Sequence, residues 1–93
     1  MAHRWTYEED YICAKACVRY KEEEFVNIYD LLRYLSVRLP NISSGSIRMK
    51  IQNIKGVCSA YQLPNKLDVS SLDQYSQQCK RAVFAAMCDA GRI

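Results

Sequence analysis

The sequence predicts an all-α protein, and three observations support this prediction. Four stretches repeat their apolar residues with the spacing of a helix that buries one face. Each stretch is preceded by a Ser, Thr or Asn, which are residue types that cap helix N-termini. No segment has the strict apolar–polar alternation of a half-buried strand. The 93 residues fit one domain, which we expect to span 1–93.

The first helix is expected over about 7–20. Thr6 can serve as its N-cap, and Glu9 stands three residues later, as a capping box requires. The helix has two apolar arcs, one formed by Ile12, Cys13, Ala16, Cys17 and Tyr20, the other by Tyr11, Ala14 and Val18. A helix with two apolar sides packs between neighbours or faces a partner.

Two further helices follow with a short turn between them. The second is expected over about 27–38, beginning at an asparagine cap, and it must end before Pro40. The third is expected over about 44–61, with Ser43 or Ser44 as its cap. Isoleucines at helical spacing mark the buried side of the third helix.

A fourth helix is expected over about 71–90. Ser70 is its candidate cap because Asp73 follows three residues later. Gly91 suits the position just after a helix C-terminus, where a left-handed backbone is common.

Charge is distributed unevenly along the chain. The formal net charge is +3, yet 31–67 contains six Lys or Arg residues and no acid. Such a block predicts either a basic surface that faces a polyanion or an ordinary solvated face. The N-terminal ten residues are polar and acidic, and no apolar run approaches the roughly 18 residues of a membrane span. We therefore expect a cytoplasmic protein.

The five cysteines predict no disulfide framework, because their number is odd and nothing indicates secretion. Cys13 and Cys17 lie one helical turn apart, but no second Cys or His pair has zinc spacing. We expect buried thiols with no metal and no cofactor. Strings typical of nucleotide binding or of a serine nucleophile are absent as well, so we expect no catalytic activity.

A short turn followed by a basic helix is the arrangement of a helix-turn-helix, whose second helix enters the major groove of DNA. With the isoleucines inward, the outward face of the third helix carries amides at its centre and cations at its edges. Gly45 and Gly56 belong to the same outward face. Amides pair with adenine, Arg pairs with guanine, and Lys neutralises phosphates. The predicted contacts to double-stranded DNA are Ser44, Ser46, Arg48, Met49, Lys50, Gln52, Asn53 and Lys55.

Three strings also resemble a known family. The stretch Arg4–Asp10 resembles the W-T-x-E-E-D opening of Myb/SANT-like, homeodomain-like DNA-binding repeats. Together with Leu-Pro-Asn at 39–41 and the string 45–54, it is similar to modules at the N-terminus of bacterial HNH-type restriction endonucleases. The resemblance implies a homeodomain-like three-helix core, here followed by a fourth helix. It also implies DNA binding without cleavage, because the sequence stops at Ile93 and its one histidine cannot build an HNH-type site.

A second hypothesis belongs to another class of function. The chain could be a phage or mobile-element inhibitor that blocks a nucleic-acid-handling defence enzyme, with carboxylates that occupy the enzyme's phosphate channel. Apolar residues off the main stripes could complete such a surface or form a homodimer. The candidate partner residues are Glu22, Glu23, Glu24, Tyr11, Val18 and Phe84.

Overall fold

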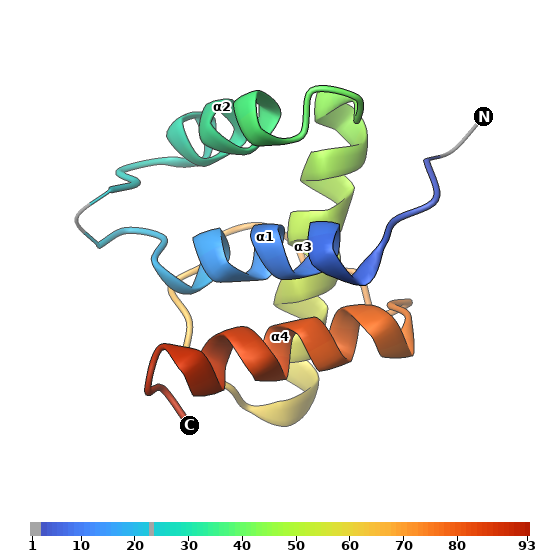
Figure 1. Ribbon diagram of the computed structural model, residues 1–93. Helices are drawn as coiled ribbons and strands as arrows, with labels where there is room; N and C mark the ends of the chain where they lie inside the picture. Colours follow the sequence, from blue (N-terminus) through green and yellow to red (C-terminus); the bar gives the residue numbers. More distant parts are fainter. Residues whose placement is uncertain (1–2, 23) are drawn as a thin grey trace.

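The computed structural model describes residues 3–22 and 24–93, and it folds them into four helices (Figure 1). The helices are α1 (Tyr7–Val18), α2 (Ile28–Arg38), α3 (Ser44–Tyr61) and α4 (Gln77–Asp89). Across these ranges there is no strand, so the all-α prediction is confirmed. None of the helices described is both long and apolar enough to cross a membrane.

The helix α1 lies at the centre of the fold, between α2 and α4, with α3 crossing behind it (Figure 1). Its N-terminus is fixed by the predicted capping box: Glu9 N–H donates to Thr6 Oγ1, and Thr6 N–H donates to the Glu9 carboxylate. Both of its apolar arcs contribute buried residues, Cys17 from one and Ala14 from the other. The two-sided apolar pattern thus reflects a helix that packs between neighbours.

The caps of α2 and α3 are also confirmed. Asn27 accepts a hydrogen bond from Asp30 N–H, and Ser43 accepts one from Ser46 N–H. The helix α3 continues past Gly56 and ends at Tyr61, after which Gln62 takes the left-handed conformation.

The predicted start of α4 is wrong. Residues 71–76 are not helical; α4 begins at Gln77, and its cap is Ser76, which accepts from Cys79 N–H. The preceding segment instead runs along α3, where Leu72 N–H donates to the Gln52 carbonyl at 3.0 Å. In a helix that begins at residue 71, the Leu72 N–H would lie in the first turn and would need a cap as its acceptor. Here the Gln52 carbonyl of α3 is the acceptor instead. The predicted end is confirmed, with Gly91 at φ 70°.

Four of the five thiols lie in the core, and Cys88 is exposed. Burial raises the pKa of Cys58 and of Cys79 to about 11. Burial likewise raises the pKa of Cys13 to about 12 and, together with a hydrogen bond to Asp68, that of Tyr20 to about 12. In the described part of the chain, no three His, Cys, Asp or Glu side chains cluster as metal ligands do.

These thiols predict an alkaline limit to stability. Their folded pKa values lie above the unfolded value of about 9, so their contribution is complete below pH 9 and is lost as pH rises toward 11–12. The free energy of unfolding, measured by urea titration, should therefore fall between pH 9 and pH 11.

At pH 8, an aromatic disulfide reagent should modify Cys88 quickly and the other four thiols only on unfolding. Rapid modification of two or more thiols in the folded protein would contradict this packing.

Candidate nucleic-acid interface

The turn between α2 and α3 is held in place by two buried side chains, Leu39 and Ile42. Leu39 N–H donates to the Leu35 carbonyl and ends α2, and Ile42 N–H donates back to the Leu39 carbonyl at 3.1 Å. Pro40 cannot continue the helix, so the chain reverses within a few residues. The result is a fixed geometry between α2 and the beginning of α3.

The N-terminal half of α3 presents an open surface. Ser44, Gly45 and Arg48 are exposed, and Met49 keeps 57% of its surface accessible. Gln52 is half-buried at the end of this surface. Ser46 is also half-buried, and its hydroxyl accepts a hydrogen bond from Ser43 Oγ, so it supports the cap.

Lys50 does not belong to this surface, and the prediction that it points outward is wrong. Its side chain is buried, with Nζ 2.9 Å from Asp10 Oδ1 of α1 and 4.8 Å from the centre of the Trp5 ring. Helical periodicity predicts Lys50 at the edge of the outward face, but the buried Asp10 carboxylate of α1 attracts its ammonium group into the protein. In this conformation its charge is neutralised inside the protein and cannot reach a phosphate.

Asp10 and Lys50 are the centre of a wider polar cluster. The Gln78 amide of α4 donates to Asp10 Oδ2 and to the Trp5 carbonyl, both at 2.9 Å. The Asp10–Lys50 contact lacks hydrogen-bond angles, so charge attraction and the face of Trp5 hold the ammonium. The cluster thereby joins the N-terminal segment to α1, α3 and α4. It also brings together two of the three strings on which the family resemblance depends, 4–10 and 45–54.

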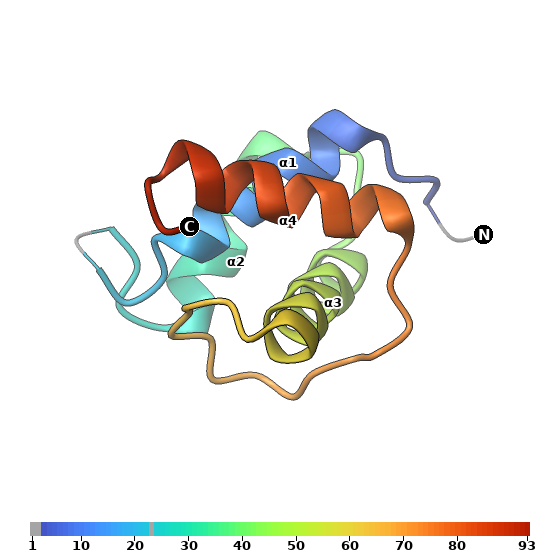
Figure 2. The ribbon, with the colours of Figure 1, turned by 90° about the horizontal axis from the view of Figure 1, so that it is seen from below.

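The C-terminal half of α3 is covered on one side by the segment 62–76, which crosses the side of α3 away from α4 (Figure 2), while residues 59–61 in its last turn are exposed. Gly56 is buried there, and a Cβ added at this position would lie only 2.1 Å from the Leu72 carbonyl oxygen. The prediction that Gly56 faces outward is therefore wrong; this glycine permits close backbone approach. Asn53 and Lys55 are half-buried, and Lys55 Nζ donates to Asn65 Oδ1 at 3.0 Å.

A hollow that the sequence did not predict lies beside the open half of α3. It measures about 420 Å³ and lies between the N-terminus of α2, the side chains of Arg48 and Gln52, and residues 68–70. Lys21 lines it too and pairs with Asp68 at 2.7 Å. Because the hollow is built partly from the segment before α4, no local pattern in the sequence could have revealed it.

The described residues of the predicted protein-partner surface make contacts within the chain or are buried. Glu22 pairs with Arg92, which lowers the pKa of the Glu22 carboxyl, and Glu24 pairs with Arg19. Val18 is buried, so its inclusion was wrong. Tyr11 is half-buried and donates to Asp89, and Phe84 packs edge-to-face on Tyr61, whereas Glu23 lies outside the described residues.

Comparison with protein-family models, curated proteins and solved structures finds no match to this chain. The resemblance to Myb/SANT-like modules therefore stays a prediction.

The buried pair predicts a clear difference between two lysines of α3. Lys50→Met should lower the free energy of unfolding by about 3–5 kcal/mol, because it leaves the Asp10 carboxylate buried without a counter-charge. Adding Asp10→Asn should recover most of that loss. Lys55→Met is the matched control and should cost about 1 kcal/mol, since it removes one half-exposed hydrogen bond. Equal effects of the two lysine variants in urea titrations would contradict the assignment.

Proposed function

We propose that this protein binds duplex DNA through the N-terminal half of α3, as a small transcriptional regulator does, with α1, α2 and α3 as a homeodomain-like core. One observation carries the proposal: the open surface of α3, which begins at Ser44 and ends at Gln52, lies directly after the tight turn, whereas the segment 62–76 covers the same side of the helix farther along. In helix-turn-helix proteins, it is the N-terminal residues of the second helix that contact base edges. The covered half of α3 is the part that this docking does not need.

The open surface offers the groups that base recognition uses. The Arg48 guanidinium can donate two hydrogen bonds to guanine, and the Gln52 amide can pair with adenine. Met49 can contact a thymine methyl. The N–H groups of Ser44 and Gly45 lie in the first turn, where a helix has no acceptor of its own for them, and they suit a phosphate.

The surrounding charge also favours a polyanion. Among the residues that the structure describes, no carboxylate lies within 4.0 Å of Arg48. The nearby Asp68 is already neutralised by Lys21, so the hollow beside Arg48 does not repel a phosphate strongly. A cation left without a partner attracts the DNA backbone and makes binding depend on salt.

The inhibitor hypothesis gains no comparable support. Its carboxylates were to bind cations of an enzyme, yet Glu22 and Glu24 are engaged with Arg92 and Arg19 of the same chain. An external partner would have to replace both of these ion pairs. DNA binding therefore remains the function that the geometry favours.

Selection from a random duplex pool, followed by fluorescence anisotropy, tests the proposal. Arg48→Ala should weaken binding to the selected site by about 1–3 kcal/mol, and Gln52→Ala should relax the preference at one base pair. The logarithm of affinity should fall linearly with the logarithm of salt concentration. Arg81→Ala, which removes an exposed arginine of α4, is the matched control and should bind normally. Failure to bind any duplex at low salt, or equal losses in Arg48→Ala and Arg81→Ala, would overturn the proposal.

A further inference from the structure

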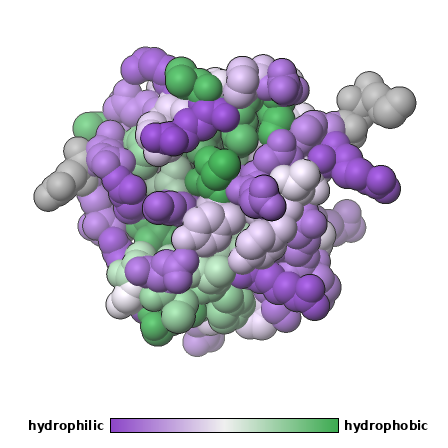
Figure 3. Space-filling view, in the orientation of Figure 1, coloured by the Kyte–Doolittle hydropathy of each residue, from purple (hydrophilic) through white to green (hydrophobic). Residues whose placement is uncertain are grey.

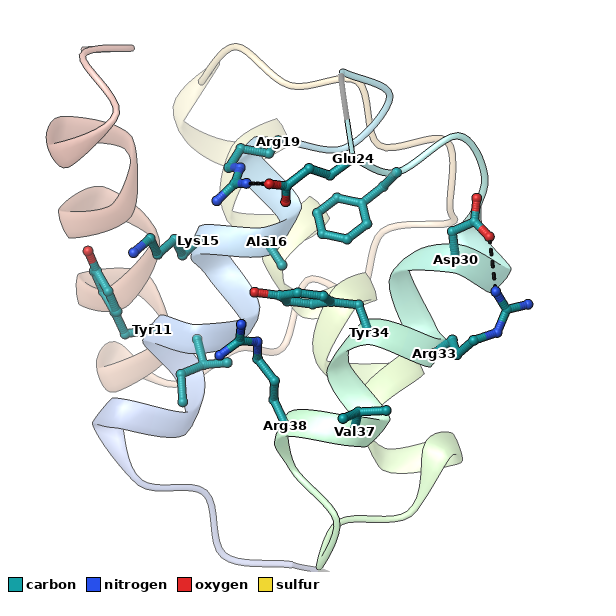
Figure 4. A pocket seen from close by; sticks show the side chains of 12 residues that line it. Tyr11, Lys15, Ala16, Arg19, Glu24, Asp30, Arg33, Tyr34, Val37 and Arg38 are labelled. Carbon is teal, nitrogen blue, oxygen red and sulfur yellow. Dashed lines mark hydrogen bonds and ion pairs between the residues drawn. The ribbon is translucent and has the colours of Figure 1, made fainter.

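A second surface lies between α1 and α2, apart from the open half of α3. It is a groove of about 1200 Å³ (Figure 4). Ile12 and Ala16 of α1 line it from one side, and Phe25 and Tyr34 line it from the other. Figures 1 and 2 place α3 behind α1, and Figure 3 shows hydrophobic atoms between α1 and α2 framed by hydrophilic ones.

The aromatic part of the groove is held rigidly. Phe25 meets Tyr34 edge-to-face with ring centres 5.0 Å apart. The Arg38 guanidinium lies over the Tyr34 ring, 4.6 Å from its centre. A ring with contacts on its edge and face keeps one position, so a ligand would meet a preformed floor at little cost in side-chain entropy.

The rims of the groove carry an excess of positive charge. Four cations line it, and two of them are neutralised within it: Arg19 pairs with Glu24, and Arg33 lies 3.4 Å from Asp30. The other two are Lys15 on α1 and Arg38 on α2, and neither has a carboxylate within 4.0 Å among the residues described. The groove therefore combines an apolar floor with one uncompensated cation on each wall.

We propose that this groove binds an acidic amphipathic helix of a protein partner. Apolar side chains of the partner would contact Ile12, Phe25 and Tyr34, and its carboxylates would pair with Lys15 and Arg38. The wall formed by α2 has 11 residues, about 16 Å in length, which matches a ligand helix of about three turns. Val37, at 76% exposure, extends the apolar surface at one rim.

Two other occupants fit less well. In a symmetric dimer, this face would meet its own copy, and the uncompensated Lys15 and Arg38 of one copy would approach those of the other. A DNA backbone could pair with Lys15 and Arg38, but it would gain nothing from an apolar floor. An occupant with both apolar and acidic groups satisfies the whole lining. Binding of such a helix in the groove would be independent of DNA binding by α3.

Peptide display provides the test. The probe is a library of helical peptides of about 14 residues whose apolar positions follow i, i+3, i+4 and i+7, with flanking positions drawn from Glu, Gln and Lys. Selection on the intact protein should enrich Glu at the flanks. Lys15→Glu and Arg38→Glu should each weaken the selected peptide by about tenfold in fluorescence anisotropy. A Glu→Lys change in the peptide should restore binding to one of these variants.

The controls keep the outcome decisive. Lys66→Glu reverses an exposed charge outside the groove and should leave peptide binding unchanged. Thermal melts confirm that each variant folds, and Arg38→Gln replaces Arg38→Glu if the latter does not. Enrichment of Lys or of no flanking residue would overturn the proposal. So would displacement of the peptide by duplex DNA, or a Lys66→Glu variant that loses as much affinity as Arg38→Glu.

Discussion

One buried ion pair, between Asp10 of α1 and Lys50 of α3, determines how the helices of this protein meet. Removing both charges from water is costly, and the attraction between them offsets the cost only when the surrounding groups hold them in a favourable geometry. Here Gln78 of α4 donates to the carboxylate, and the face of the Trp5 ring receives the ammonium. Three helices and the N-terminal segment must therefore be in place together for the pair to be satisfied.

This constraint also fixes which side of α3 faces outward. With Lys50 turned toward α1, the opposite side of the helix is left to Arg48, Met49 and Gln52 in its first half. In its second half, the same side is occupied by the segment 62–76, which Gly56 admits at close range. The proposed DNA surface is thus short, and it coincides with the part of a helix that is most favourable for anions and for base contacts.

Features that depend on neighbouring residues, such as helix caps, could be predicted from the sequence. Features that depend on contacts between distant residues could not. The caps at Thr6, Asn27 and Ser43 are local hydrogen bonds and were predicted correctly. The Ser70 cap failed although its pattern is equally good, because the backbone nearby bonds to α3 instead. Lys50 was misplaced for the same reason: its partner lies on another helix, where helical periodicity carries no information. The α1–α2 groove joins two helices and escaped prediction likewise.

Amide chemical shifts of the ¹⁵N-labelled protein, recorded during titration with the selected duplex, test the central claim most directly. The account predicts that the saturable changes concentrate on Ser44, Gly45, Arg48, Met49 and Gln52, with smaller changes at the start of α2. The amides of the covered half of α3 and of the α1–α2 groove should remain nearly unchanged. Saturable changes concentrated in the covered half or in the groove would contradict the account, as would no saturable change at all.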